Sequence, residues 1–260
     1  MTTSLQKSLT VFAAASLTDA FRELGAVYEV SSGVSVSFNF GASTQLRTQL
    51  EQGAAADVFA SADQIQMDTA RGAGVVRGAD IPFARNRLVI ITPRNNPAGI
   101  LRPLDLANPG IKVVTASSEV PIGVYTQNML DAMSQTEGIG PRFKDAVNAN
   151  IVSREPNVRQ VVAKVQLGEA DAAVVYLTDV TPSSAADLMT VTIPDELNTI
   201  ATYPIALVST SPQPELGNAF IDLVLSAAGQ AILQRWSFTP VGPTALNQQP
   251  RPSAPEQAAS

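Results

Sequence analysis

The chain has 260 residues, of which 45% are hydrophobic and 15% charged, a composition typical of a globular protein with a sizeable core. Its formal net charge of −6 argues against nucleic acid or an anionic membrane surface as a direct partner, and an anionic ligand would have to be held by local dipoles. The sequence contains neither cysteine nor histidine, which excludes disulfides, thiol chemistry and catalytic arrangements built on Ser-His-Asp or Cys-His.

The first part of the chain shows one local arrangement twice: a short strand, a turn of small residues, a serine and a helix. Leu9–Phe12 has the composition of a strand, and Ser16 follows at the expected helix N-cap with Asp19 as its capping-box partner. The alternating run Val34–Phe40 leads in the same way to Ser43 at a second N-cap. One capping serine is usually only structural. Two such units instead suggest two hydroxyls that face one crevice, beside helix N-termini that favour anions.

Strands and helices alternate through the rest of the chain, which predicts a mostly parallel α/β architecture. Further strands are expected at Ala56–Ala60, Leu88–Thr92, Ile111–Thr115, Ile151–Ser153 and Ala172–Tyr176. Further helices are expected to begin at Asp63, Pro121, Pro156, Leu216 and about Ala228.

Three stretches are expected to lie outside the regular elements of the fold. Ile81–Phe83 and Arg85–Arg87 are assigned to a connecting stretch, and Met1–Lys7 is interpreted as a leftover or replaced leader. Residues 244–260 are rich in Pro, Gln, Ala and Ser, which predicts a disordered tail. No run approaches the ~20 consecutive apolar residues that a membrane span needs.

Six segments in this order resemble the periplasmic molybdate-binding proteins of ABC transporters: AAASLTDAF, FGASTQL, ADVFASAD, RNRLVIITP, VPIGVYT and NVRQVVAKVQLGEADAAVVYLTDV. The resemblance extends from about Leu9 to Val241. It implies an α/β, two-lobed periplasmic-binding-protein fold of type II, in which each lobe is a mostly parallel sheet flanked by helices and the ligand cleft lies between the lobes. Lobe 1 would comprise residues 1–86 and 202–243, and lobe 2 residues 87–201. The stretch Ile200–Ser209, which contains Pro204, is expected to return the chain to the first lobe.

The same resemblance implies an oxyanion site made of five residues. Ser16 and Ser43 would donate their hydroxyls from lobe 1, while Ile122 and Val158 would offer backbone N–H groups and Tyr176 its phenol from lobe 2. Four of the five lie at expected helix starts, where free N–H groups and the positive end of the helix dipole face outward. Taken alone, first-turn prolines and a tyrosine at a strand end are usually structural. Ile122 replaces an alanine that many relatives have, and its side chain would shrink the pocket if it pointed inward.

The sequence therefore predicts a periplasmic or otherwise extracytoplasmic solute-binding protein, not an enzyme, that captures molybdate or tungstate and delivers it to a membrane ABC permease. No catalytic residue, no cofactor and no direct protein ligand to molybdenum is expected, and the chain is expected to be a monomer. A site made of donors would disfavour hydrogen phosphate, whose proton needs an acceptor. The alternatives are a receptor for sulfate or another tetrahedral oxyanion and a ligand-sensing domain of the same fold. An enzyme on this scaffold has least support.

Overall fold

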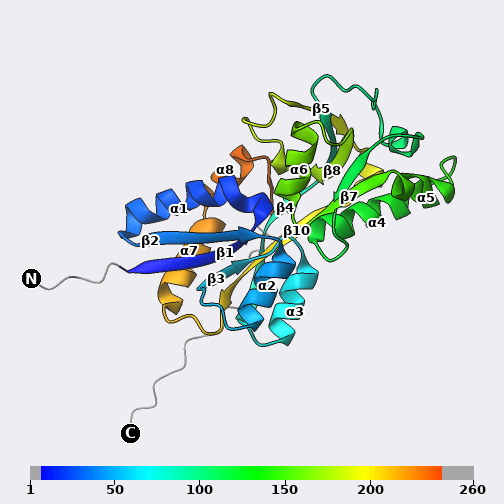
Figure 1. Cartoon of the computed structure of the whole chain (residues 1–260). Helices are drawn as coiled ribbons and strands as arrows, with labels where there is room; N and C mark the ends of the chain where they lie inside the picture. The colour runs from blue at the N-terminus through cyan, green and yellow to red at the C-terminus, as the bar shows by residue number, and fades with distance from the viewer. Residues whose placement is uncertain (1–6, 242–260) are drawn as a thin grey trace, which may run out of the picture.

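The computed structural model describes residues 7–241 and shows two lobes, each built on one β-sheet (Figure 1). The first sheet has six strands and the second has five. Across the first sheet the order is β11 (Thr239–Pro240), β4 (Val76–Asn86), β10 (Ala201–Val208), β3 (Val58–Ala60), β1 (Ser8–Ala14) and β2 (Ser35–Gly41). Across the second it is β7 (Ile151–Glu155), β6 (Val113–Ala116), β8 (Ala172–Tyr176), β5 (Leu88–Pro93) and β9 (Leu188–Thr192).

Both sheets are mixed, whereas the sequence pattern predicted mostly parallel ones. In the first sheet β1 is parallel to β2 and β3, but β10 is antiparallel to β3 and β4. In the second sheet β6 is parallel to β7 and β8, but β5 is antiparallel to β8 and β9. The reversed strands β5 and β10 are those on which the chain enters the second lobe and returns to the first.

Helices cover both sheets, and short 3₁₀ turns follow several strands (Figure 1). The helices of the first lobe are α1 (Thr18–Ser32), α2 (Ser43–Glu51), α3 (Gln64–Gly72), α7 (Pro214–Leu225) and α8 (Ala227–Arg235). Those of the second are α4 (Pro121–Gln135), α5 (Arg142–Ala149) and α6 (Val158–Gln166). The 3₁₀ turns are η1 (Ala15–Leu17), η2 (Pro103–Ala107), η3 (Leu177–Asp179) and η4 (Asp195–Leu197).

The stretch expected to connect the lobes is mostly strand: β4 includes Ile81–Phe83 and continues to Asn86. Pro82 interrupts the β pattern in the sequence, because proline has no N–H for a sheet ladder. It is accommodated here since it lies opposite Pro204 of β10, where the register of the two strands shifts. Only Arg87 separates β4 from β5, so the first crossover between the lobes is very short.

Helix α1 is fixed to the first sheet by an apolar face that repeats every three to four residues: Ala20, Phe21, Leu24 and Tyr28 are buried. The ring centroid of Phe21 lies 5.7 Å from that of Phe83 on β4 and 5.9 Å from that of Phe220 on α7. This packing holds the turn that precedes α1, which carries Ser16, in a defined place.

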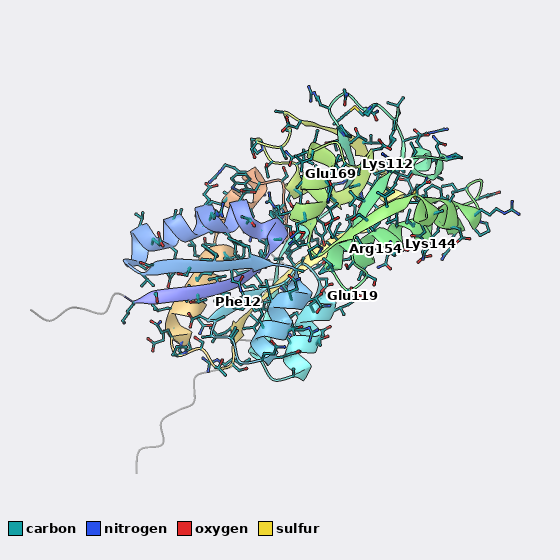
Figure 2. All side chains as sticks on the ribbon, in the orientation of Figure 1. Phe12, Lys112, Glu119, Lys144, Arg154 and Glu169 are labelled. Carbon is teal, nitrogen blue, oxygen red and sulfur yellow. The ribbon has the colours of Figure 1, made fainter. Side chains whose placement is uncertain are left out.

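The two lobes also touch directly at the rim between them. The Thr44 hydroxyl at the start of α2 donates to the carbonyl oxygen of Glu119 in the second lobe, and Figure 2 shows Glu119 beside the first-lobe helices. Within residues 7–241, only α7 and α8 taken together have the length and apolar character to cross a membrane, and they are bent by 63°. The expected tail 244–260 lies outside the described residues, as does all of the expected leader except Lys7.

Candidate functional site

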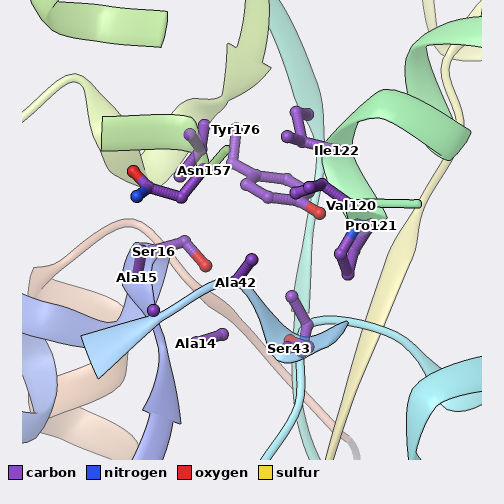
Figure 3. A pocket seen from close by; sticks show the side chains of 13 residues that line it. Ala14, Ala15, Ser16, Ala42, Ser43, Val120, Pro121, Ile122, Asn157 and Tyr176 are labelled. Atoms are coloured by element: carbon purple, nitrogen blue, oxygen red, sulfur yellow. The ribbon is translucent and has the colours of Figure 1, made fainter. Parts of the chain in front are cut away.

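A small cavity lies between the two lobes, and all five residues of the predicted oxyanion site line it (Figure 3). The centre of a water molecule can move through about 20 Å³ of it, which is space on the scale of one or two waters or a small ion. The thirteen lining residues are Ala14, Ala15, Ser16, Gly41, Ala42, Ser43, Ala62, Val120, Pro121, Ile122, Asn157, Val158 and Tyr176. None of these side chains carries a charge.

Strand topology explains why residues so distant in sequence meet here. Ser16 follows β1 and Ser43 follows β2, and these strands are parallel neighbours. Ile122, Val158 and Tyr176 follow or end β6, β7 and β8, which are also parallel neighbours. The carboxyl ends of parallel strands lie on one edge of a sheet, where α/β proteins place their ligand sites. In this protein those edges of the two sheets face each other.

Ser16 is at the cavity, but it is not the helix cap that the sequence predicted. It lies inside the 3₁₀ turn η1, and the N-cap of α1 is Leu17, which offers no side-chain hydrogen bond. The small residues before Ser16 permit this extra turn. The Ser16 Oγ instead lies 2.9 Å from the Tyr203 Oη, and Asp19 pairs with Arg159 at 2.5 Å rather than completing a capping box.

Ser43 is the first residue of α2 rather than its N-cap, which is Ala42. Its Oγ accepts a hydrogen bond of 2.9 Å from the backbone N–H of Ala62, in the loop between β3 and α3. The Ser43 proton is therefore available to another acceptor. Because Ala42 has no side chain that could cap the helix, the first N–H groups of α2 also lack a partner from the cap.

Ile122 lies in the first turn of α4, as predicted. The N-cap Val120 provides no side-chain acceptor and Pro121 has no N–H, so the amide of Ile122 is the first donor of this helix. A Cβ on Gly123 would come within 2.1 Å of the Ser117 carbonyl oxygen, so this position requires glycine and the start of α4 is held close to the preceding loop. The Ile122 side chain is 1% exposed and packs in the apolar core.

Val158 is the first residue of α6 and also lies at a helix start, as predicted. The helix begins later than expected, however: Asn157 is the N-cap and its side chain accepts from the Gln160 N–H at 3.1 Å. Pro156 therefore precedes the cap instead of occupying the first turn. Val158 lines the cavity at the positive end of the helix dipole, and its amide, at the first position of the helix, has no intrahelical partner.

Tyr176 ends β8 and closes the cavity from the second lobe. It is 1% exposed, and its hydroxyl has no hydrogen-bond partner among the described residues. Burial raises the pKa of Tyr176 well above its ordinary value, so the phenol keeps its proton. A buried hydroxyl without a partner costs about 1–3 kcal/mol. The Tyr176 hydroxyl can therefore donate a hydrogen bond to an acceptor bound in the cavity.

No carboxylate lines the cavity. Asp57 and Asp179, which lie close to the site segments in the sequence, have structural partners, as predicted. Asp57 accepts from the Thr10 N–H at 2.8 Å and from the Ser211 hydroxyl at 2.6 Å. Asp179 is fully buried and accepts from the Tyr176 N–H at 3.2 Å. Burial raises the pKa of Asp179 to about 7, although the neighbouring Arg159 guanidinium acts in the opposite direction. Across residues 7–241 no three His, Cys, Asp or Glu side chains gather into a metal-binding group.

Three residues that support the site were not identified from the sequence: Arg159, Tyr203 and Asn86. The Arg159 guanidinium, from the second lobe, donates to the Ala15 carbonyl oxygen at 3.2 Å besides pairing with Asp19. Tyr203 and Asn86 are buried next to Ser16 on β10 and β4. Their polar side chains in strands that carry the chain between the lobes were the only local signal.

The comparisons with known proteins agree with this architecture. The family model described as bacterial extracellular solute-binding protein matches residues 9–239. The chain is 39% identical over 233 residues to the molybdate-binding protein ModA of Mycobacterium tuberculosis, covering 89% of this chain and 84% of that protein.

Two solved structures have the same fold. The periplasmic molybdate-binding protein of Azotobacter vinelandii superposes with a TM-score of 0.77 at 18% identity. The match covers 90% of this chain and 100% of the A. vinelandii chain. The sulfate-binding protein SubI of M. tuberculosis superposes with a TM-score of 0.82 at 22% identity, and the match covers 92% of this chain and 89% of SubI. These structures confirm the predicted two-lobed fold, and the sequence similarities confirm the resemblance that the motifs indicated. The chain belongs to the family of bacterial extracellular solute-binding proteins.

Proposed function

We propose that this protein captures molybdate or tungstate as the intact oxyanion between its lobes and delivers it to a membrane ABC permease. One structural observation carries the proposal: an uncharged interlobe cavity contains a buried tyrosine hydroxyl without a partner among residues 7–241, alongside serine hydroxyls and the first residues of helices. The choice of ion is supported by the 39% identical relative, which is named for molybdate binding. In this proposal binding involves no catalytic step and no cofactor.

The donors in the cavity suit a dianion that has lost its hydration shell. Removing such an ion from water is expensive unless hydrogen bonds replace the lost water contacts. Ser43 and Tyr176 each have a hydroxyl proton to give, and the amides of Ile122 and Val158 add two backbone donors. Ser16 contributes a further hydroxyl. The dipoles of α2, α4 and α6 also favour negative charge at this point.

The balance between donors and acceptors supports selectivity by protonation state. Hydrogen phosphate carries a proton that needs an acceptor, and the thirteen lining residues include no carboxylate. Leaving that proton without a partner would cost affinity. Sulfate has the charge and shape of molybdate but is smaller, so it would be distinguished by the spacing of the lobes. The fold shared with a sulfate-binding protein favours neither ion.

Binding between the lobes links ligand capture to a closed arrangement. Donors come from both lobes, so the ion favours the arrangement in which they converge. Direct contacts between the lobes add to it, among them the Arg159–Asp19 ion pair and the hydrogen bond from Thr44 to Glu119. Release to the permease would require these contacts to open, with the two crossovers as the hinge. We propose that the protein acts as a monomer, in an extracytoplasmic compartment.

Calorimetric titration of the purified protein with molybdate, tungstate, sulfate and phosphate in one buffer tests the proposal. We expect tight binding of the first two ions and little response to the others. Ser16→Ala should weaken molybdate binding by about 10- to 150-fold, the effect of losing one hydrogen bond to a charged group. Ser31→Ala, at an exposed position near the end of α1, is the matched control and should change nothing. Binding of sulfate alone, or of none of the four ions, would overturn the proposal.

A further inference from the structure

A buried chain of hydrogen bonds leads from the first crossover to the Ser16 hydroxyl. The Tyr203 hydroxyl lies 2.9 Å from the Ser16 Oγ and 3.2 Å from the Asn86 Nδ2. Tyr203 is fully buried and Asn86 is 1% exposed, and neither lines the cavity. The hydrogen bonds of both residues therefore reach a ligand through Ser16, while the Tyr203 ring also packs against Tyr176.

The direction of this chain is determined by the Asn86 side chain. Its Oδ1 accepts from the Arg87 N–H at 3.0 Å, and its Nδ2 donates to the Thr178 Oγ1 at 2.8 Å as well as to the Tyr203 oxygen. Rotating the amide by 180° would place its NH₂ group against the Arg87 N–H, donor against donor. The NH₂ group therefore faces Tyr203, and the Tyr203 oxygen must accept from it.

Of the two described residues that hydrogen-bond to the Tyr203 hydroxyl, Asn86 and Ser16, only Ser16 can then accept its proton. Burial raises the pKa of Tyr203 well above its ordinary value, so the phenol keeps this proton, and leaving it without an acceptor in the interior would be costly. Tyr203 therefore donates and Ser16 accepts. The Ser16 proton is left to point away from Tyr203, toward the cavity that Ser16 lines (Figure 3).

We propose that Asn86 and Tyr203 are positioning residues that set Ser16 as a hydrogen-bond donor, so that the site prefers fully deprotonated oxyanions to hydrogen phosphate. This inference rests on the proposed function. The backbone N–H of Ala62 likewise makes Ser43 a donor toward the cavity, because it donates to the Ser43 Oγ. Substitution of side chains cannot reverse the direction of this hydrogen bond. At Ser16 the direction depends on two side chains, so a single substitution can reverse it.

Asn86→Asp is the isosteric test. At pH 8 a carboxylate at position 86 cannot donate to Tyr203 and accepts its proton instead. The Tyr203 oxygen then accepts from Ser16, whose lone pairs turn toward the cavity and can receive the proton of hydrogen phosphate. We expect the ratio of molybdate to hydrogen phosphate affinity, measured by calorimetry, to fall at least tenfold. The added negative charge alone would weaken both dianions by a similar factor and leave the ratio unchanged.

Tyr203→Phe is the second variant, and it introduces no charge. It removes the proton that Ser16 accepts, so Ser16 can present either a proton or a lone pair, and the affinity ratio should again fall. Asn86→Asp in the Tyr203→Phe background should change the ratio no further. Tyr28→Phe removes a buried phenol hydroxyl far from the cavity, which donates to the Leu216 carbonyl oxygen, and serves as the control that keeps the ratio.

The outcomes separate this inference from the proposed function. A wild-type protein that binds no molybdate would refute the proposed function itself. A wild-type protein that binds molybdate, with an affinity ratio that stays within twofold in both Asn86→Asp and Tyr203→Phe, would refute only the positioning role. Thermal unfolding of each variant shows that the compared proteins are folded.

Discussion

Replacing Tyr176 with phenylalanine should stabilise the free protein while weakening its ligand binding. The Tyr176 hydroxyl is buried and has no partner among the described residues, although the ring packs against Tyr203 with centroids 5.8 Å apart. Phenylalanine keeps the ring and removes only the unpaired group. A residue retained for stability would give the opposite sign in the free protein, so the experiment distinguishes a ligand donor from a structural tyrosine.

The magnitudes follow from the cost of an unpaired hydroxyl and the value of a bond to a charged ion. Removing a buried polar group that lacks a partner relieves part of a cost of about 1–3 kcal/mol, so the free variant should gain about 1 kcal/mol. Losing one hydrogen bond to an anion should reduce binding by about 1.5–3 kcal/mol, or about 10- to 150-fold in Kd. In saturating molybdate the order reverses, and the variant should be about 0.5–2 kcal/mol less stable than wild type.

Urea denaturation with and without molybdate, together with calorimetry, measures both effects. Tyr28→Phe is the matched control, because the Tyr28 hydroxyl is also in a buried residue but donates to the Leu216 carbonyl oxygen at 2.9 Å. It should lose about 1 kcal/mol under both conditions and keep the wild-type Kd. If Tyr176→Phe destabilises the free protein as much as Tyr28→Phe does, or if its Kd is unchanged, the assignment of Tyr176 as a ligand donor is wrong.

Three further substitutions test other parts of the site. Ser43→Ala removes a donor and leaves the Ala62 N–H without its acceptor, so titration should show an affinity loss of about 1.5–3 kcal/mol and denaturation a stability loss of about 1–3 kcal/mol; an unchanged Kd would contradict the first. Ile122→Ala should cost about 2–5 kcal/mol of stability but change Kd by less than about threefold, because its side chain packs in the apolar core and only its amide is proposed to bind the ligand; a larger change would show that the side chain shapes the pocket. Asp179→Asn tests the carboxyl whose folded pKa is raised to about 7 by burial. The folded protein binds this proton more tightly than the unfolded chain does, so its stabilising effect is complete below the ordinary pKa of about 3.9 and is lost as pH rises to about 7. Denaturation across this range should show a flatter pH dependence in the variant, and an equal slope would contradict the assigned burial.

The site could be located from the sequence because each of its segments has a local signature. A strand, small residues and a helix start are encoded within about ten residues at Ser16 and Ser43, and the family resemblance added Ile122, Val158 and Tyr176; the structure brings all five residues to one cavity. The partners of the hydroxyls could not be found in this way. Tyr203 is 187 residues from Ser16, and a serine before a helix looks the same whether it caps the helix or bonds to a distant phenol.

Strand direction was the other feature that local pattern did not determine. Both β5 and β10 are apolar runs of the kind found in buried strands of either direction, so alternation with helices suggested parallel pairing throughout. Their reversal follows from the path of the chain between the lobes, because each of them pairs with strands that are far away in the sequence. Likewise β4 was not predicted, because Pro82 interrupts the β pattern of the sequence. The register shift opposite Pro204 that accommodates this proline can be seen only in the structure.

The absence of charge from the cavity lining suits the proposed discrimination between fully deprotonated oxyanions and hydrogen phosphate. A lysine or arginine in the cavity would raise the affinity for every anion, hydrogen phosphate included, because a point charge does not sense whether an oxygen carries a proton. A hydrogen-bond donor with a fixed direction does distinguish the two cases, because it can bind a deprotonated oxygen but cannot accept the proton of a protonated one. Three of the five proposed donors are each oriented by a different buried contact: Ser16 by Tyr203, Ser43 by the Ala62 N–H, and the Ile122 amide by the tight start of α4. Two of these contacts lie within the first lobe and one within the second, so the donors that they orient converge on one ion only when the lobes are closed around it.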